Sequence, residues 1–498
     1  MKTMVGIRAD DARPGTGSLR FHGVDPDRSS VYTFVTSRNI YRAVPFSREA
    51  LFPMKFASPW RLLSLAALVL GAACAGGHGV TPSTMNPERV GALHSQFLPA
   101  AACPVAYKGK GVKVVIKDMS GLPQSGLTLF YTSSNPADKN QFQFLNKQGS
   151  TTVFAAGNSA AAFPIASCFP GSLAKPGAAF VLPLFKGGRL WISFSPKFVI
   201  AGAANGQFTG PSGWSPGAGY NQPWDTVELS DNNPGVFVNL TRVDMLGLPL
   251  QLEVLPIAKS SPFKQVGEVI ADYPKILQAL VNDAPFNKLV TTVPGFSPVV
   301  PRVLNPSHVS SFPNVYNAPA YFAGGYMKKV TAYYQKPPKP IVYNTQYKGA
   351  YCLGNWNANS NGTNFIFKQG GVTNTYPASL FTTAYIFADD PSPKYVAGTC
   401  AYLLDKILLQ ELNRGVALTP KHPMDDPKTY YPAGTINNQY ACILHKYSLH
   451  NATYAFAYDD AANQASAFSN PAPTQVNITI GPIPKTIPKP TKKAICTT

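Results

Sequence analysis

Acidic residues are scarce in this chain, and their scarcity makes one cluster stand out. Positions 110–254 hold seven carboxylates, and four of them fall within 20 positions: Asp225, Glu228, Asp231 and Asp244. Paired carboxylates are the groups that hydrolyse a glycosidic bond: one protonates the leaving oxygen, and the other activates water or attacks the sugar. Spacing alone leaves a second interpretation open, in which these acids are solvated surface charges.

The residues around Glu228 alternate as in a β-strand. Val227 and Leu229 would face one side and Glu228 and Ser230 the other, because successive side chains of a strand point to opposite faces. An Asn-Asn-Pro-Gly turn at 232–235 then ends this strand. The pattern therefore places Glu228 on the polar face of a hairpin.

The second strand of this hairpin continues the alternation but leaves Asp244 out of step. The pattern predicts a buried face of Val236, Val238 and Leu240, and an opposite face of Phe237, Asn239 and Thr241. Asp244 has the parity of the buried set. Exposing it requires a bulge or bend after Leu240, an irregularity that often re-aims a functional side chain.

A pattern of short strands is followed along the chain by a pattern of helices, and together they predict the elements that position these acids. Short strands separated by turns rich in Pro, Gly and Asn are expected at 113–116, 127–131, 188–194 and 248–254. Strand texture returns at 454–458 and 475–480, so the last strands are expected to complete the first domain. The first part therefore reads as a β-sandwich or barrel.

Helical periodicity marks the second part. A helix is expected over 268–281, where Pro274 must either kink it or open a second helix. A stronger pattern covers 399–413, with Thr399 as its N-cap and a glycine after its end. A third helix is expected over 439–450. His445 and His450, five residues apart, are expected on its surface rather than on a metal.

The front of the chain reads as a secretory signal. A short cationic stretch at 54–61 precedes an apolar segment at 62–73, which is too short for a comfortable transmembrane helix. A buried core helix is the alternative. Met54 is then the expected initiator, and residues 1–53 are an upstream extension. Cys74 allows a lipoprotein signal as a minority interpretation, because Gly71 stands where Leu is usual.

The cysteines agree with export. Without Cys74 the chain has six: Cys103, Cys168, Cys352, Cys400, Cys442 and Cys496. None forms a C-x-x-C pair, so a zinc cluster is not expected. One to three disulfides in an oxidising compartment are expected, with the pairing open.

Charge excludes further classes. The formal net charge is +19, yet charged residues make up only 13% of the chain. Neither a charge-rich disordered protein nor a nucleic-acid binder with dense basic blocks is indicated. The basic excess suits attachment to anionic surfaces. A G-x-S-x-G pattern at 213–217 lies in a Gly/Pro-rich loop rather than a strand–turn–helix elbow, which argues against a serine hydrolase.

Several fragments together resemble glycoside hydrolase family 64, the β-1,3-glucanases of the thaumatin-like superfamily. They are found, in the family's order, at 188–194, 224–229, 241–250, 412–415 and 454–460. The resemblance runs from about residue 105 to 482. It implies a mainly β fold: a thaumatin-like β-sandwich or barrel domain and a mixed α/β domain flanking a wide groove. The expected organisation is an extension (1–53), signal (54–75), linker (76–104), β domain (105–260, completed by 451–483), α/β domain (261–450) and Pro/Lys-rich tail (484–498).

The resemblance also implies which residues act. The family's catalytic Glu matches Glu228 and its Asp matches Asp244. We expect Glu228 to be the general acid and Asp244 the general base, although the sequence does not decide which is which. Inversion places the carboxyl groups roughly 6.5–9.5 Å apart, whereas about 5 Å would point to retention. The candidates for sugar binding are Ser230, Asn232, Phe237, Thr241, Asp459 and Asp460.

Two of these groups carry an open alternative. Phe237 stands where the family favours an indole, so stacking on sugar would be weaker there. Asp459 and Asp460 follow an expected strand and would bind sugar from the other side of the groove, or else form a solvated acidic turn.

The sequence thus predicts a secreted endo-β-1,3-glucanase-like hydrolase. Its expected partner is β-1,3-glucan, with no nucleic acid, no cofactor, no metal, and a monomeric mature form without a membrane span. Two alternatives remain: a non-catalytic glucan-binding or antifungal protein on the same scaffold, and a structural surface lipoprotein anchored at Cys74.

Overall fold

The computed structural model divides the chain into two compact units, Met1–Arg61 and Leu62–Thr498. The first contributes a short hairpin of β1 (Thr33–Val35) and β2 (Ile40–Arg42). In the second, the structure describes residues 107, 111–168, 178–231, 235–257, 264–311, 321–322, 325–345, 352, 354–388, 394–396, 399–419, 427–459, 464–491 and 496. The expected signal, the linker, Cys74, Cys103, Asn232 and Asp460 lie outside the described residues.

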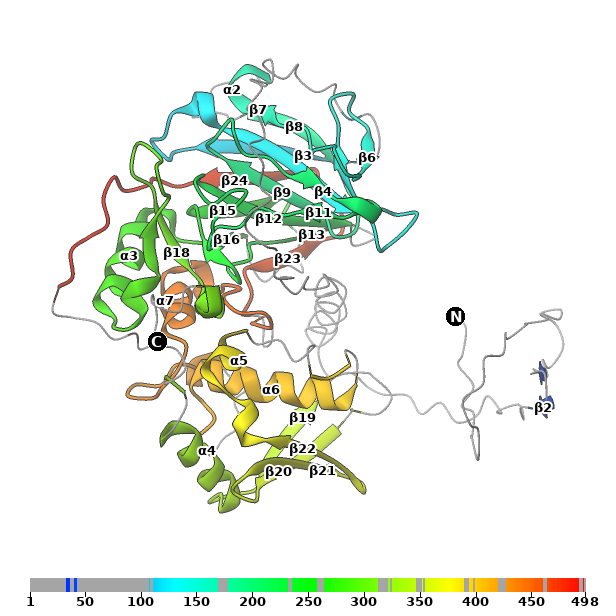
Figure 1. Cartoon of the computed structure of the whole chain (residues 1–498), viewed down its shortest axis with the longest axis vertical. Helices are drawn as coiled ribbons and strands as arrows, with labels where there is room; N and C mark the ends of the chain where they lie inside the picture. Colours follow the sequence, from blue (N-terminus) through cyan, green and yellow to red (C-terminus); the bar gives the residue numbers. More distant parts are fainter. Residues whose placement is uncertain are drawn as a thin grey trace, which may run out of the picture. The chain divides into compact units, whose positions relative to one another are not determined.

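Two antiparallel-rich sheets form a sandwich in the second unit (Figure 1). The larger has the order β23 (Ala467–Asn470), β13 (Val236–Asn239), β12 (Trp224–Asp231), β9 (Arg189–Ser193), β4 (Thr128–Ser134), β5 (Phe142–Leu145) and β6 (Thr151–Val153), with β7 (Phe163–Pro164) beside β4. The smaller has the order β16 (Gln265–Gly267), β15 (Leu250–Leu255), β24 (Gln475–Ile480), β3 (Gly111–Asp118) and β8 (Ala178–Pro183).

The sandwich forms because its strands alternate between apolar and polar residues. In β15 and β24 every second side chain is buried, and these side chains join one core with those of β3, β9, β12 and β13. β24 pairs antiparallel with β15 and parallel with β3, so a strand from the end of the chain closes the sheet begun at residue 111. β23 likewise pairs with β13. The expectation of a mainly β fold is confirmed.

The outer face of the larger sheet is also covered. Phe130, Trp191 and Trp224 form a second core there with the aromatic residues of neighbouring loops, including the small hairpin β10 (Ala201–Gly202) and β11 (Phe208–Thr209). The centre of this sheet is therefore buried on both sides. A sheet that is packed on both faces is rigid, and it is therefore a suitable support for functional side chains on its strands.

The α/β part surrounds a third core. Its sheet has the order β19 (Ile341–Thr345), β20 (Gly354–Ser360), β21 (Asn364–Gln369) and β22 (Val372–Pro377). Figure 1 shows α4 (Gly325–Gln335), α5 (Thr383–Ala388) and α6 (Cys400–Arg414) around these strands. α3 (Tyr273–Asn282) and α7 (Gln439–Tyr447) contribute to the same core. A three-stranded sheet of β14 (Met245–Leu246), β18 (Pro301–Leu304) and β17 (Val290–Thr292) completes the set, and a short helix α2 (Ile165–Cys168) follows β7.

The helix predictions succeed where the chain supplies its own capping residues. α6 begins after Thr399, whose hydroxyl accepts a hydrogen bond from Tyr402 N at 3.2 Å, and it ends at Gly415 in the left-handed region (φ 72°). For Pro274 within the expected range 268–281, the sequence allowed either a kink or the start of a second helix, and the second alternative is confirmed. Pro274 opens the helix, which begins at Tyr273, because a proline lacks the N–H that an interior turn needs.

The third expected helix is confirmed as α7, which begins at Gln439 as expected and ends at Tyr447 rather than at residue 450. The prediction of a strand over 454–458 was wrong, because these residues form no strand.

Disulfides link Cys352 to Cys400 and Cys442 to Cys496, and Cys168 is also disulfide-bonded, as the cysteine count led us to expect. Among the described residues, none of the helices is long and apolar enough to span a membrane.

Candidate active site

Glu228 lies in a row of three polar residues on adjacent strands. On β12 it pairs with Arg189 of β9 on one side and with Asn239 of β13 on the other. Arg189 Nη2 donates to Glu228 Oε1 at 2.6 Å, and Asn239 Nδ2 donates to Oε2 at 2.7 Å. The Glu228 side chain keeps 14% of its surface exposed. The neighbouring strands thus fix both carboxylate oxygens while the side chain stays partly exposed.

Asp244 reaches the site because the hairpin ends irregularly. β13 stops at Asn239, residues 240–244 leave the strand conformation, and β14 starts at Met245. The bend predicted after Leu240 is therefore present. The Asp244 side chain is 50% exposed, and its Oδ1 lies 3.1 Å from His308 Nε2. His308 belongs to the 3-10 helix η7 (Pro306–Ser311), which follows β18.

The charge of the Arg189 guanidinium acts on both carboxylates. Burial by itself would raise the pKa of Asp244. The hydrogen bond and charge of His308, with the charge of Arg189, outweigh it and lower the pKa below its usual value. Arg189 is also the ion-pair partner of Glu228. Both carboxylates thus lie within the field of one arginine, and Asp244 is held ionised at neutral pH.

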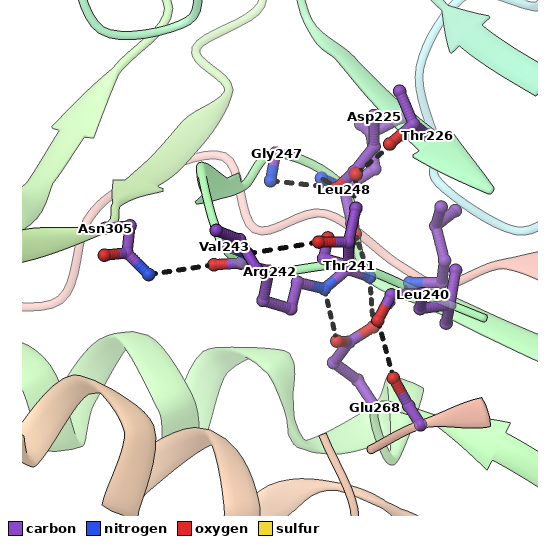
Figure 2. A network of polar contacts seen from close by, with 12 residues as sticks. Asp225, Thr226, Leu240, Thr241, Arg242, Val243, Gly247, Leu248, Glu268 and Asn305 are labelled. Carbon is purple, nitrogen blue, oxygen red and sulfur yellow. Dashed lines mark hydrogen bonds and ion pairs between the residues drawn. The ribbon is translucent and has the colours of Figure 1, made fainter. Parts of the chain in front are cut away.

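Asp225, the first acid of the conspicuous cluster, has a structural role (Figure 2). Its Oδ1 accepts from Arg242 Nη1 at 2.9 Å, and its Oδ2 accepts from the backbone N–H of Gly247 and Leu248 at 3.0 and 2.9 Å. Arg242 Nε and Nη2 bind the two oxygens of Glu268 at 2.7 and 2.8 Å. All three charged side chains are buried.

This buried triad, Asp225–Arg242–Glu268, supports the loop that carries Asp244. Burial works against the charge of Arg242, but the two carboxylates raise the pKa of its guanidinium above the usual value. Arg242 therefore stays charged, two residues before Asp244. Neither Arg242 nor Glu268 can be identified as a partner of Asp225 from the sequence, because the Arg242–Glu268 pair joins segments 26 residues apart.

The structure treats the predicted sugar-binding residues differently. Ser230 pairs with Phe237 one step along the strands from Glu228, so the structure brings these residues together. Ser230 is buried, and Phe237 is half-buried. Thr241 Oγ1 accepts from Val243 N at 3.4 Å, within the bend. Asn232 and Asp460 lie outside the described residues.

Asp459 is buried between two helices. Its Oδ1 accepts from Arg414 Nη2 of α6 at 3.0 Å, and its Oδ2 lies 2.8 Å from His445 Nε2 of α7. The side chain has no exposed surface from which to contact a sugar. The prediction that His445 lies on the helix surface was wrong, because this pairing buries it; His450 is exposed.

Three side chains at the site escaped the sequence analysis: Arg189, Asn239 as a partner of Glu228, and His308. The G-x-S-x-G loop also lies nearby, since the Trp214 ring stacks on His308 with centroids 3.8 Å apart and planes 12° apart. Ser215 is not set up as a nucleophile; its hydroxyl lies 2.9 Å from that of Ser212. Strand pairing was the only signal that could have found Asn239.

No metal site accompanies these residues in the described part of the chain, where no three His, Cys, Asp or Glu side chains gather suitably. Two carboxylates under the charge of one arginine, of which one has a lowered pKa, are groups of the kind that glycoside hydrolysis uses.

The family model of glycoside hydrolase family 64, described as β-1,3-glucanase, matches residues 112–480. The chain belongs to this family and is a glycoside hydrolase acting on β-1,3-glucan. This membership confirms the resemblance inferred from the sequence.

Solved structures share the fold. A β-1,3-glucanase domain of family 64 from Clostridium beijerinckii is 20% identical, with a TM-score of 0.58 over 76% of this chain and 100% of that one. A laminaripentaose-producing β-1,3-glucanase in complex with laminaritetraose is 19% identical, with a TM-score of 0.60 over 75% of this chain and 99% of that one. No curated protein matches the sequence.

Proposed function

We propose that this protein is a secreted endo-β-1,3-glucanase that cleaves linear, laminarin-type glucan with inversion, using Glu228 and Asp244. The observation that carries the proposal is Arg189, which pairs with Glu228 and also lowers the pKa of Asp244. Two carboxylates 16 positions apart, one on β12 and one in the bend before β14, thereby act on one small region of the surface.

Asp244 suits the base. A general base must be ionised before it takes a proton from the attacking water, and His308 and Arg189 hold Asp244 in that state. Its half-exposed side chain gives water access. The acid role then falls to Glu228. Asn239 fixes Glu228 Oε2, so Oε1 is the oxygen that would protonate the leaving group once substrate displaces the partly exposed Arg189.

The neighbouring strand face suits a linear glucan. Phe237 lies beside Glu228 on the same face and, being only half-buried, offers a ring to the sugar next to the cleaved bond, whereas the neighbouring Ser230 is buried. The laminaritetraose complex of the similar structure supports a linear β-1,3-linked ligand for this fold. Secretion is supported by the apolar segment at 62–73 and by the disulfides.

The decisive experiment compares Glu228→Gln and Asp244→Asn with wild type on laminarin, resolving product lengths and the anomer first formed. Each variant should lower kcat by roughly 10²- to 10⁴-fold, because each removes a proton-transfer group. Binding of laminarin should persist. Asp231→Asn is the matched control, since it removes a charge from the same strand outside the proposed machinery.

Two results would overturn the proposal. Wild-type turnover by either carboxylate variant would remove that residue from the chemistry. Products that keep the anomeric configuration of the substrate would mean that the second carboxylate acts as a nucleophile and not as a base. A second experiment, mass spectrometry of the exported N-terminus, separates a free small residue from an acylated Cys74.

A further inference from the structure

A single turn holds the backbone on which Asp244 sits. The N–H of Asn305 donates to Asp244 O at 3.0 Å, and its side-chain Nδ2 donates to Arg242 O at 3.0 Å. Ser307 Oγ donates to Val243 O at 3.3 Å. Three consecutive residues, 242–244, are therefore bound through their carbonyls. The next residue of this turn, His308, binds the Asp244 side chain.

The other side of His308 is bound as well. Trp214 stacks on the imidazole at a centroid distance of 3.8 Å, and the His308 side chain keeps only 16% of its surface exposed. The Trp214 loop is itself anchored, because the guanidinium of the buried Arg302 donates to Gly213 O at 2.7 Å and Tyr220 O at 3.0 Å. Arg302 and His308 belong to one continuous segment. That segment fixes both the indole and the imidazole.

We propose that His308, held by Trp214, is a positioning residue that aims Asp244 at the attacking water. The imidazole donates from Nε2 to Asp244 Oδ1, and Oδ2, the other oxygen of this half-exposed side chain, takes the proton. This inference rests on the proposed role of Asp244 as base. It gives the 213–217 loop, which has the wrong context for a nucleophile, a part in the same reaction.

The arrangement ties the pH dependence of the reaction to His308. The charged groups that act on Asp244 are His308 of η7 and Arg189 of β9, and Arg189 in turn pairs with Glu228 of β12. Removing His308 takes away a hydrogen bond and a charge that both lower the pKa of Asp244. That pKa then rises, so the acid limb of the rate profile moves to higher pH. A side chain needed only for folding would not move this limb.

The test measures kcat, KM and the pH profile of kcat/KM on laminarin for four variants of the full chain. His308→Ala should lower kcat by roughly 10- to 100-fold, the value of a hydrogen bond to a charged group. KM should change little, and the acid limb should shift upward. His308→Gln keeps an N–H donor and should recover most of kcat. Trp214→Ala should lower kcat by about threefold, within the range for one ring contact, and Trp214→Phe should stay near wild type.

The outcomes separate this inference from the proposed function. If Asp244→Asn abolishes turnover while His308→Ala keeps the wild-type kcat and acid limb, the positioning role fails alone. Equal losses in His308→Ala and His308→Gln, with an unmoved acid limb, would also overturn it, because they indicate a structural side chain. Full activity of Asp244→Asn would instead overturn the proposed function.

Discussion

Two arginine–carboxylate groups share strand β12 and behave oppositely. Asp225 faces Arg242 in the buried triad, and three residues later Glu228 faces Arg189 in a partly exposed pair. The Arg242 side chain is 0% exposed and that of Arg189 is 37% exposed. Arg242 uses Nε, Nη1 and Nη2 on two carboxylates. The residue types are the same, and the depth at which each side chain lies differs.

Depth decides what each group can do. Carboxylates and a guanidinium removed from water are stable only when their polar atoms are well bonded to one another, so the triad is fixed and cannot take part in exchange with a ligand. A partly exposed ion pair contributes little to stability, but it can exchange partners. The buried triad therefore organises the Asp244 loop, and the open pair is left for substrate.

The largest effect on stability is expected for Arg242→Met. Removing the arginine leaves Asp225 and Glu268 buried without their cation, which should lower the free energy of unfolding by about 3–5 kcal/mol. Urea denaturation at pH 7 measures this change. The matched control adds Asp225→Asn and Glu268→Gln to the same variant and should regain part of the loss. A loss below about 1 kcal/mol would show that the triad is not what stabilises this loop.

The local parts of the fold could be predicted from the sequence. Alternation in the 224–240 hairpin gave the buried Val236, Val238 and Leu240, all with no exposed surface, and the side on which Glu228 lies. The out-of-step parity of Asp244 gave the bend. α6 was predictable because Thr399 and Gly415 cap it. Each of these signals lies within a few residues of the feature that it predicts.

The remaining features depend on contacts between distant segments. His308 binds Asp244 across 64 positions, and Asp459 meets Arg414 across 45. No local pattern indicates such a partner. The same limit applies to Glu268: its sequence context predicts the start of a helix, whereas in the structure its carboxylate binds Arg242. A charge in a sequence is known by type, and its role is set by the partner that the fold brings to it.

Asp405 of α6 extends the comparison to a buried carboxylate that has no ion-pair partner among the residues that the structure describes. Tyr385 OH donates to its Oδ2, whereas Oδ1 is buried and lacks a hydrogen-bond partner within the described residues. Burial raises the pKa of Asp405 to about 7. The folded state thus binds the proton more tightly than the unfolded chain, so stability falls as pH rises from about 4 to 7.

Asp405→Asn should therefore stabilise the protein above pH 7 by roughly 1–3 kcal/mol, since one pKa unit corresponds to about 1.4 kcal/mol. At pH 4, where the carboxyl is already neutral, the gain should vanish. Urea denaturation at both pH values measures the difference. An equal gain at both would mean that the effect comes from packing rather than from the charge.

The smallest expected effect on stability, at the open pair, tests the other side of the comparison. Arg189→Met should change the free energy of unfolding by less than about 1 kcal/mol, because the pair that it breaks is partly exposed. Activity should nevertheless fall, and the acid limb of kcat/KM should move to higher pH, because the charge that helps to lower the pKa of Asp244 is gone. Arg189→Lys keeps that charge and should leave the limb near its wild-type position. If Arg189→Met instead lost as much stability as Arg242→Met, the distinction between a fixed buried triad and an exchangeable, partly exposed pair would fail.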